Sequence, residues 1–313
     1  MRTDKLKTNS FVFLFTVLIS LYLCGTAKAK VCDASEIEPD RMSSQSISKI
    51  DYVELGNKMI SAERWNEAIR AFCASINSKA EVPTALNNLA FVYSRLERYE
   101  DAVEALTQAI NLKKQYHSSE ADFAKAYYNL GNCYLVLKQI SKALDALKKS
   151  LECNPNNVQA INDLGVAYLA MKQFPEAISA FKRAIELDKN FSFGFCNLGT
   201  VYFETGQLKE ARKNFLEAVR LNPNFAEAYF FLGTIQFKLE KRDEAIKLFE
   251  KTVELQPDFA EAHYNLSIAF MAQKKTELSL KHYKILKNLN NSLASSLLEK
   301  LQSDKVVAAN KLK

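Results

Sequence analysis

Apolar residues recur along this chain with a fixed period. Each period is marked by a leucine followed by a small residue, and the interval from one pair to the next is 34 except for one step of 41. The pairs are Leu55-Gly56, Leu89-Ala90, Leu130-Gly131, Leu164-Gly165, Leu198-Gly199, Leu232-Gly233 and Leu266-Ser267. A period of this length predicts a solenoid of stacked repeats, an architecture that presents a surface and rarely encloses a catalytic pocket.

Within one period the apolar positions have the spacing of two helices. In the fourth period, Gly165 and Tyr168 fall on one face of a first helix. Ala177, Phe181 and Ala184 form a matching stripe on a second helix. Glycine inside a helix costs about 1 kcal/mol relative to alanine. Because glycine recurs at this position in five periods, we expect that it lets the two helices approach closely.

The repeated residues resemble those of the tetratricopeptide repeat family. Tyr128-Asn129-Leu130-Gly131-Asn132 matches the family pattern, as does Ala177-Ile178 with Phe181, Ala184 and Ile185-Glu186-Leu187. The resemblance covers about residues 48–290 and implies an all-α, right-handed superhelical solenoid of seven helix-turn-helix repeats. The expected repeats are about 49–82, 83–123, 124–157, 158–191, 192–225, 226–259 and 260–290.

Two segments depart from this regularity. The longer step adds seven residues around 113–119, which we expect to lengthen the adjoining helices or their turn, or to form a contact loop. After Asn290-Asn291-Ser292, apolar residues continue at helical spacing as Leu293, Leu297, Leu298 and Leu301. Residues 291–313 are therefore expected to form a helix that caps the last repeat, followed by a frayed tail.

Residues 1–29 differ in character from the rest of the chain. A basic start precedes an almost wholly apolar run from Phe11 to Cys24, and Ala27-Lys28-Ala29 follows. This order is typical of a secretory signal peptide cleaved after Ala29, so we expect an exported protein, periplasmic or secreted, with a flexible linker at 30–47. An uncleaved membrane anchor is the alternative, although a spanning helix needs roughly 20 apolar residues. Leu23 stands where a bacterial lipoprotein signal has a small residue, which argues against lipid attachment at Cys24.

The net charge of +6 arises in part from this N-terminal segment. Without residues 1–29 the chain has 38 basic and 35 acidic side chains, and its lysines are interleaved with glutamates as on a solvated helix face. The sequence has no basic stripe with interleaved aromatic residues, so a nucleic-acid partner is not expected.

The exported chain would hold five cysteines in a compartment that permits disulfides. Cys133 and Cys153 lie in one repeat at heights that differ by about 12 Å, which is too far for a bridge. Cys32 and Cys73 are the better pair, because a mobile linker can bring Cys32 to the first repeat. The remaining cysteines are expected to be buried free thiols.

No motif for catalysis or metal binding is evident in the sequence. The chain has His117, His263 and His282, but no His-Glu-x-x-His, paired Cys-x-x-Cys or glycine-rich phosphate loop. His263 and His282 belong to the two helices of the last repeat, where they could approach each other, but without a third ligand we expect them to pack at the surface. We therefore predict no enzyme activity, cofactor, metal or small-molecule substrate.

In the family that the chain resembles, the first helices line a concave groove. Its positions lie three before, and one and four after, the glycine. Residues two before it form an asparagine ladder, suited either to bonding a bound peptide backbone or to bracing neighbouring helices. The predicted partner-binding residues are Tyr128, Asn132, Phe193, Asn197, Phe203, Phe230, Phe237 and Tyr264. The phenylalanines would form an aromatic strip in the later repeats, unless they pack between helices as core.

These features predict an exported scaffold that binds a peptide or helix of another protein in the groove of its repeats. The family's clamp for acidic chaperone tails is absent, because its lysine positions hold Val53, Asn87, Tyr128, Asn162, Cys196, Phe230 and Tyr264. The alternative is an accessory subunit that recruits substrate to a separate envelope or secretory-pathway enzyme. Membrane contact is expected only if the N-terminal segment stays uncleaved.

Overall fold

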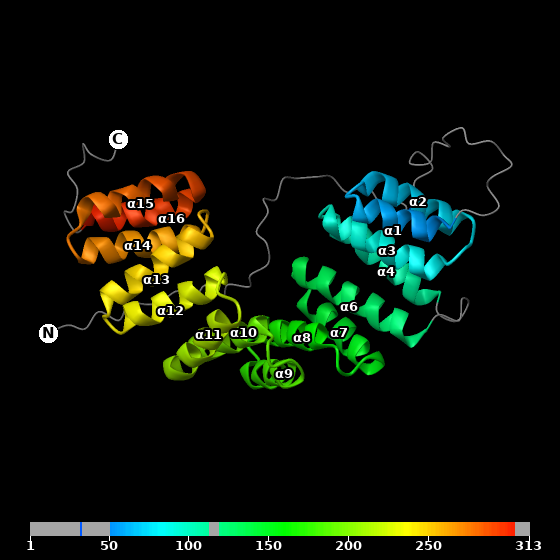
Figure 1. The fold of residues 1–313 in the computed structure, drawn as a ribbon, viewed down its shortest axis with the longest axis horizontal. Helices are drawn as coiled ribbons and strands as arrows, with labels where there is room; N and C mark the ends of the chain where they lie inside the picture. Colours follow the sequence, from blue (N-terminus) through cyan, green and yellow to red (C-terminus); the bar gives the residue numbers. More distant parts are fainter. Residues whose placement is uncertain (1–31, 33–50, 113–118, 304–313) are drawn as a thin grey trace. The chain divides into compact units, whose positions relative to one another are not determined.

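The computed structural model describes residue 32, residues 51–112 and residues 119–303. All secondary structure in these ranges is helical, in 15 helices that follow one another as hairpins (Figure 1). The predicted all-α fold of helix-turn-helix repeats is thereby confirmed. The predicted signal peptide, nearly all of the linker and the tail after Ser303 lie outside the described residues.

Seven hairpins account for all but one of the helices in the described ranges. They are α1 (Tyr52–Ser61) with α2 (Trp65–Asn77), α3 (Val82–Arg95) with α4 (Tyr99–Asn111), α6 (Glu120–Val136) with α7 (Ile140–Cys153), α8 (Val158–Ala170) with α9 (Phe174–Leu187), α10 (Ser192–Glu204) with α11 (Leu208–Leu221), α12 (Ala226–Lys238) with α13 (Arg242–Leu255), and α14 (Ala260–Ala272) with α15 (Thr276–Leu289). The last helix is α16 (Asn291–Ser303).

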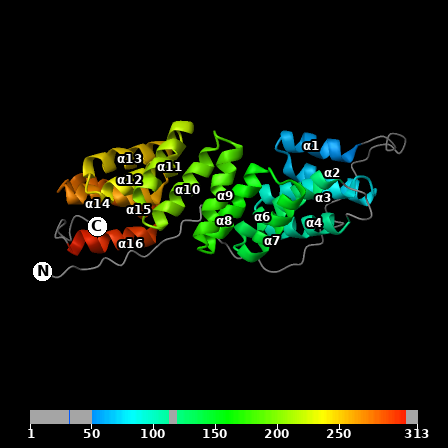
Figure 2. The same cartoon turned by 90° about the horizontal axis from the view of Figure 1, so that it is seen from below.

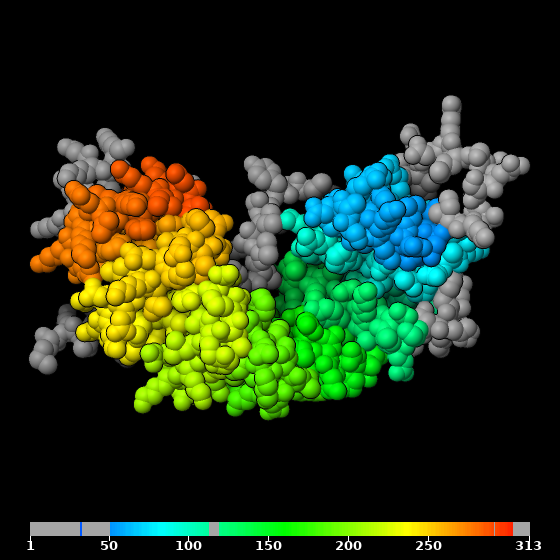
Figure 3. All heavy atoms as spheres, viewed as in Figure 1, coloured from blue at the N-terminus to red at the C-terminus, as the bar shows by residue number. Residues whose placement is uncertain are grey.

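Contacts divide the chain into two compact units, Met1–Arg183 and Ala184–Lys313, which we call the N-terminal and C-terminal units. Within each unit consecutive hairpins pack on one another, as α4 packs on α6 and α13 on α14. Figure 2 shows the helices of each unit in the same order from a second side, and Figure 3 shows side chains of neighbouring hairpins in contact. Among the described residues, no helix is both long and apolar enough to cross a bilayer.

The glycine of each Leu-Gly pair faces the side chain 16 positions later. A Cβ added to Gly165 would lie 2.6 Å from the ring of Phe181, closer than any Cβ can pack. In all seven hairpins the side chain at this position is at most 6% exposed: Phe72, Leu106, Leu147, Phe181, Phe215, Phe249 and Tyr283. In the seventh hairpin Ser267 replaces the glycine, and its hydroxyl donates to the carbonyl of Ser279 at 2.9 Å. The recurrent glycine therefore sets how closely the two helices approach, as the sequence predicts.

Each hairpin turns at a residue with positive φ, seven positions after the small residue. These residues are Glu63, Glu97, Lys138, Lys172, Gly206, Glu240 and Lys274. In the fourth hairpin the amide of Gln173 donates to the carbonyl of Tyr168 at 2.9 Å, and the amide of Lys172 donates to Leu169 at 2.8 Å. This is the Schellman pattern that ends a helix. Because only Gly206 lacks a side chain, each of the other turns holds an L-residue in a region that costs about 1 kcal/mol.

The longer step between the second and third periods changes the start of α6. This helix begins at Glu120, ahead of Gly131, and it thus starts about one helical turn earlier than α8, which begins at Val158, ahead of Gly165. The hydroxyl of Ser119 accepts from the amide of Asp122 at 3.2 Å, and the Asp122 carboxylate accepts from the amide of Ser119 at 3.3 Å. This capping box stabilises the earlier start. Part of the insertion therefore lengthens α6, and the rest falls in residues 113–118, outside the described ranges.

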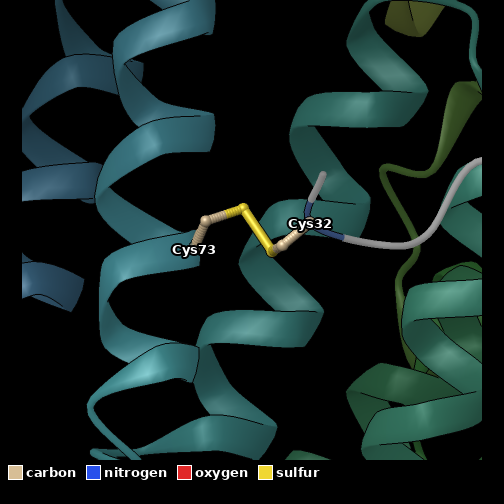
Figure 4. The surroundings of a disulfide bond; sticks show 2 residues. All are labelled: Cys32 and Cys73. Atoms are coloured by element: carbon tan, nitrogen blue, oxygen red, sulfur yellow. A yellow bond between two sulfur atoms is a disulfide. The ribbon is translucent and has the colours of Figure 1, made fainter. Parts of the chain in front are cut away.

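A disulfide joins Cys32 to Cys73 of α2 (Figure 4), with their Cα atoms 5.8 Å apart. Cys73 is fully buried, and Cys32 packs against the core of the first hairpins. This is the pair that the sequence favours. Cys133, Cys153 and Cys196 are free; the first and last are buried as predicted, whereas Cys153 is only half-buried.

Helix α16 packs against the last hairpin. The amide of Leu293 donates to the side chain of Asn290 at 3.0 Å, which fixes the start of the helix. Leu297 and Leu301 are fully buried against Leu286 of α15 and its neighbours. Ser292, Ser295, Ser296, Glu299 and Lys300 of α16 are exposed, so the helix covers an apolar surface with a polar one.

Candidate partner-binding surface

The first helices of the hairpins contribute one continuous set of side chains in each unit. We call it the first-helix face: the residues six, three and two before, and one and four after, the small residue. In the N-terminal unit it is formed by α1, α3, α6 and α8, each of which contacts the next. In the C-terminal unit it is formed by α10, α12 and α14. Since residues three and four apart share one side of a helix, the same register of each helix belongs to the same face.

Asparagines connect the first helices of the N-terminal unit. The side-chain amide of Asn88 donates to Oδ1 of Asn57 at 2.9 Å, and that of Asn129 donates to Oδ1 of Asn87 at 3.1 Å. Each bond joins one hairpin to the next. The sequence leaves open whether the asparagine ladder bonds a peptide backbone or braces neighbouring helices. These amides brace neighbouring helices.

Asp163 of α8 places a carboxylate in the same ladder. It accepts from the side-chain amide of Asn162 at 3.1 Å and is hydrogen-bonded to Tyr128 and Asn132 of α6. Burial raises the pKa of Asp163 to about 6, although these hydrogen bonds act in the opposite direction. Burial, followed by the Asp163 charge, raises the pKa of Tyr128 to about 12. None of the ion pairs among the described residues includes Asp163.

Two of the predicted partner-binding residues, Tyr128 and Asn132, thus meet at one carboxylate. We call Tyr128, Asn132, Asn162 and Asp163 the Asp163 cluster. The Oδ1 atom of Asn132 is buried and has no hydrogen-bond partner among the described residues. A buried acceptor left unpaired costs about 1 to 3 kcal/mol. Asp163 lies two before Gly165, at the register of the asparagine ladder. The first hairpin also has a carboxylate at this register, the exposed Glu54, so the sequence alone could not single out Asp163.

In the C-terminal unit, phenylalanines occupy part of the same face. Phe231 of α12 stacks on Phe215, with ring centroids 4.9 Å apart, and meets Phe203 of α10 edge-on at 5.5 Å. Phe230 stacks on Phe259 at 5.0 Å and packs against the core of α13. These rings join consecutive hairpins. For Phe230 the structure favours the core packing that the sequence left open.

The other predicted residues of this unit are half-buried, except Phe193, which is exposed. Phe237 packs against the core of α13 and α14. Tyr264 lies in the cluster that α16 completes, with the Lys300 ammonium 5.3 Å from its ring centroid. Asn197 of α10 is half-buried. The structure therefore does not bring Tyr128 and Asn132 together with these residues in one described cluster, since they belong to different units.

Two phenylalanines of the first helices are exposed. Phe193 is 55% exposed, although one edge meets Phe225 at 5.0 Å. Phe91 of α3 is 44% exposed and lies one position after the small residue Ala90, within the first-helix face. The sequence prediction includes Phe193 and omits Phe91. Phe91 could have been predicted from its position, because it lies one after the small residue, as the predicted residue Asn132 does in the third hairpin.

Two ionisable groups of the C-terminal unit are buried without forming reactive sites. Burial, followed by the charge of Glu227, raises the pKa of Cys196. Its sulfur therefore stays a protonated thiol and a poor nucleophile. Burial also raises the pKa of Glu261. Both groups belong to first helices of the C-terminal unit.

The two histidines of the last hairpin form a direct pair. Their Nδ1 atoms are 2.9 Å apart, and Nε2 of His263 donates to the carbonyl of Pro257 at 2.9 Å. His263 is only 4% exposed, so the predicted surface packing is wrong for this residue, and His282 stacks on Phe270. Because a carbonyl only accepts, a neutral His263 carries its proton on Nε2 and accepts from His282 at Nδ1. Burial, then the charges of His263 and Lys281, lower the pKa of His282 to about 4.

No group of three or more candidate metal ligands lies together in residues 51–112 and 119–303. In the histidine pair, both Nδ1 atoms and Nε2 of His263 are hydrogen-bonded to protein atoms.

Models of the tetratricopeptide repeat match residues 81–156, 158–191, 180–213 and 226–259, and a TPR repeat model matches 199–240, together more than half of the chain. No curated protein sequence matches the chain significantly. Among solved structures, a tetratricopeptide repeat protein from Parabacteroides merdae ATCC 43184 has a TM-score of 0.63 at 17% identity, over 79% of this chain and 96% of its own. Pseudomonas aeruginosa pilF has a TM-score of 0.61 at 19% identity, over 72% of this chain and 98% of its own.

The APC/C hetero-tetramer Cut9-Hcn1 has a TM-score of 0.66 at 16% identity, over 82% of this chain and 50% of the matched chain. At these identities the likenesses show the fold alone. The repeat pattern, the helical hairpins and the family matches agree. The chain belongs to the tetratricopeptide repeat family, and its fold is that of a protein-interaction scaffold.

Proposed function

We propose that this protein is exported and binds a segment of another protein on the first-helix face of its repeats. The observation that carries the proposal is the exposure of Phe91 and Phe193 on first helices, while the rings of the hairpin cores are buried. Aromatic side chains are over-represented among the residues that dominate protein interfaces. Binding by such a face is surface complementarity: the rings bury apolar side chains of the partner, and the amides around them bond its polar groups.

Two features support export. The order of basic, apolar and small residues in 1–29 is that of a cleavable signal peptide. The Cys32–Cys73 disulfide suits an oxidising compartment. N-terminal sequencing of the protein from its native cell should begin at Lys30. A mature protein that retains Met1 would contradict cleavage and favour the membrane anchor.

The binding face can be tested by crosslinking from single positions in the native cell. The photoreactive residue benzoylphenylalanine replaces Phe91 or Phe193 in two variants, and replaces Leu216 in a third. Leu216 is a matched control, because it is an exposed apolar residue of the second helix α11. Each unit is tested by itself: we expect crosslinks to a partner protein from Phe91 of the N-terminal unit and from Phe193 of the C-terminal unit, and none from Leu216.

The crosslinked protein is then purified and its affinity measured by calorimetry. Phe91→Ala or Phe193→Ala should weaken binding at least tenfold, and Leu216→Ala should not. Crosslinks from Leu216 alone, or equal affinity for all variants, would remove the proposal. If the partner is an active enzyme, the same face serves the accessory-subunit role.

A further inference from the structure

The Asp163 cluster differs from the same place in the other hairpins. At the position two before the small residue, four hairpins have a neutral amide: Asn88, Asn129, Asn197 and Asn265. The sixth hairpin has Phe231, and the first has Glu54, whose carboxylate is exposed. Only the fourth hairpin places a half-buried carboxylate here, that of Asp163, whose side chain has the same shape as asparagine but carries a charge. Whatever the cluster does beyond bracing α6 against α8 must therefore involve that charge.

The charge is unfavourable for the fold alone. Asp163 is half-buried, no cation of the described residues forms an ion pair with it, and its raised pKa records the cost of ionising it there. Asparagine at this position would brace the helices without that cost. Residues that lower stability in this way are common at binding sites, where a ligand later compensates them.

The unused hydrogen-bonding capacity of the cluster is all of one kind. Asn162, Tyr128 and Asn132 supply the donors to the carboxylate. What remains are acceptors: the lone pairs of Asp163 and the buried Oδ1 of Asn132. A ligand that satisfies both must bring at least two N–H groups, and a positive charge would neutralise the carboxylate. A peptide backbone N–H provides one donor and no charge.

A guanidinium group meets these requirements. It carries a fixed positive charge and presents its N–H groups in a planar fork that matches adjacent acceptors. An ammonium group is a point charge whose donors diverge. A bound metal ion would need more ligands than the described residues bring together here.

We propose that the Asp163 cluster is a recognition site for an arginine side chain of the partner segment. This inference rests on the proposed function, because it assigns the partner chemistry at one point of the same face. It predicts that the bound segment has an arginine where it crosses α6 and α8.

The proposal can be tested with n-butylguanidinium chloride as the probe, by NMR titration of the oxidised protein. The side-chain amide signal of Asn132 and the backbone amide signal of Asp163 are followed at pH 7.5, with ionic strength held constant by sodium chloride. We expect saturable shifts with a millimolar Kd. At pH 5 binding should be about tenfold weaker, because protonation of a carboxyl group with a pKa of about 6 removes the charge.

Asp163→Asn should weaken binding at least tenfold. Asp145→Asn is the matched control, because it makes the same chemical change at an exposed residue of α7, and it should leave binding unchanged. Asp163→Asn is expected to be more stable than the native protein, so its loss of binding will not reflect unfolding. Shifts that do not saturate, equal binding to Asp163→Asn, or n-butylammonium binding as tightly as n-butylguanidinium would overturn the proposal.

The crosslinking experiment and the guanidinium titration test different statements, so either can fail while the other succeeds. Loss of guanidinium binding with crosslinks from Phe91 and Phe193 intact removes the arginine site and leaves the proposed function. Crosslinks from Leu216 alone remove the proposed function, while the titration still reports whether the Asp163 cluster binds a guanidinium group.

Discussion

On the first-helix face, amide hydrogen bonds join consecutive hairpins in the N-terminal unit and aromatic rings join them in the C-terminal unit, although both units follow one repeat pattern. Asn88 joins its neighbour through an amide hydrogen bond, whereas Phe231, at the same register, joins its neighbours through ring contacts. The packing of small residue against large side chain inside each hairpin is the same in both units. The difference shows that packing inside each hairpin determines the backbone conformation. The contacts between hairpins on the first-helix face can then be either amide hydrogen bonds or aromatic ring contacts.

The two kinds of brace differ in energy. A neutral hydrogen bond contributes about 1 kcal/mol net, because water competes for both groups. A half-buried phenylalanine contributes more, through buried area and through the contact between rings. The C-terminal unit therefore depends on its face for stability, whereas the N-terminal unit can place a costly charge such as Asp163 there.

The largest expected effect is the removal of an aromatic brace. Phe231→Ala should lower the free energy of unfolding of the C-terminal unit by about 3 kcal/mol, since it removes the contacts with Phe203 and Phe215. Asn88→Ala, the same register in the N-terminal unit, should cost about 1 kcal/mol or less. Hydrogen exchange of each unit measures both changes. Equal losses would show that the two faces brace their units alike.

Acid should destabilise the C-terminal unit through the histidine pair. The pKa of His282 is lowered to about 4 in the folded protein, from 6.5 for a free histidine, so folding favours the neutral ring. The stability from this group is complete above pH 6.5 and is lost as the pH falls toward 4, by about 3 kcal/mol. Hydrogen exchange of α15, corrected for intrinsic rates, should follow this loss.

His282→Asn is the control for this prediction. Its side-chain amide can still donate to His263, but it does not titrate in this range. The variant should show a flatter pH dependence of exchange in α15. A wild-type protein that exchanges equally slowly at pH 4 and pH 6.5, or a variant with the same slope, would contradict the role of the pair.

The N-terminal unit should respond to acid in the opposite direction. The folded pKa of Asp163 is about 6, above the value of 3.8 for a free aspartate, so folding favours the protonated form. The stability that protonation brings is complete below pH 3.8 and is lost as the pH rises through 6. Asp163→Asn should therefore stabilise this unit by about 3 kcal/mol at pH 7 and have no effect below pH 4.

Urea unfolding followed by Trp65 fluorescence measures this effect, because Trp65 is the sole tryptophan of the chain and lies on α2 of the N-terminal unit. A variant less stable than wild type at pH 7 would mean that the carboxylate is already compensated within the fold.

The regular part of this molecule could be predicted from its sequence because each repeated position has one physical requirement. A glycine that meets a large side chain of the second helix leaves a signal that recurs with the period. Prolines mark the helix ends in the same way: Pro155, Pro223 and Pro257 lie two residues after the ends of α7, α11 and α13, where a helix stops easily.

The irregular part could not be predicted, because it depends on which polar side chains from different helices meet. The pattern of α14 alone does not show that His263 turns inward to His282, and that of α8 does not show that Asp163 meets Tyr128 and Asn132. Nor does the pattern of α12 show that the ring of Phe230 stacks on Phe259 of the next hairpin. A contact between hairpins depends on which two side chains meet. Periodicity shows only which residue types recur at each single position, so it cannot predict such a contact.

The smallest expected effect concerns the turns, where the units also differ. Gly206 of the C-terminal unit has a φ of 77°, and Lys172, at the same register in the N-terminal unit, has a φ of 58°. No atom lies within 4 Å of a Cβ added to Gly206, so Gly206→Ala tests the backbone alone. It should lower the stability of its unit by about 1 kcal/mol.

Lys172→Gly is the reciprocal change and should raise stability by less than about 1 kcal/mol, because glycine relieves the left-handed strain but also adds freedom to the unfolded chain. Trp65 fluorescence in urea measures the Lys172 variant, and hydrogen exchange of α10 and α11 measures the Gly206 variant. If Gly206→Ala is neutral, the left-handed residue costs nothing in this turn. Backbone strain would then not restrict which residue occupies this turn position in the other hairpins. Their turns, which have glutamate or lysine there, would differ from one another only in the charge of that side chain.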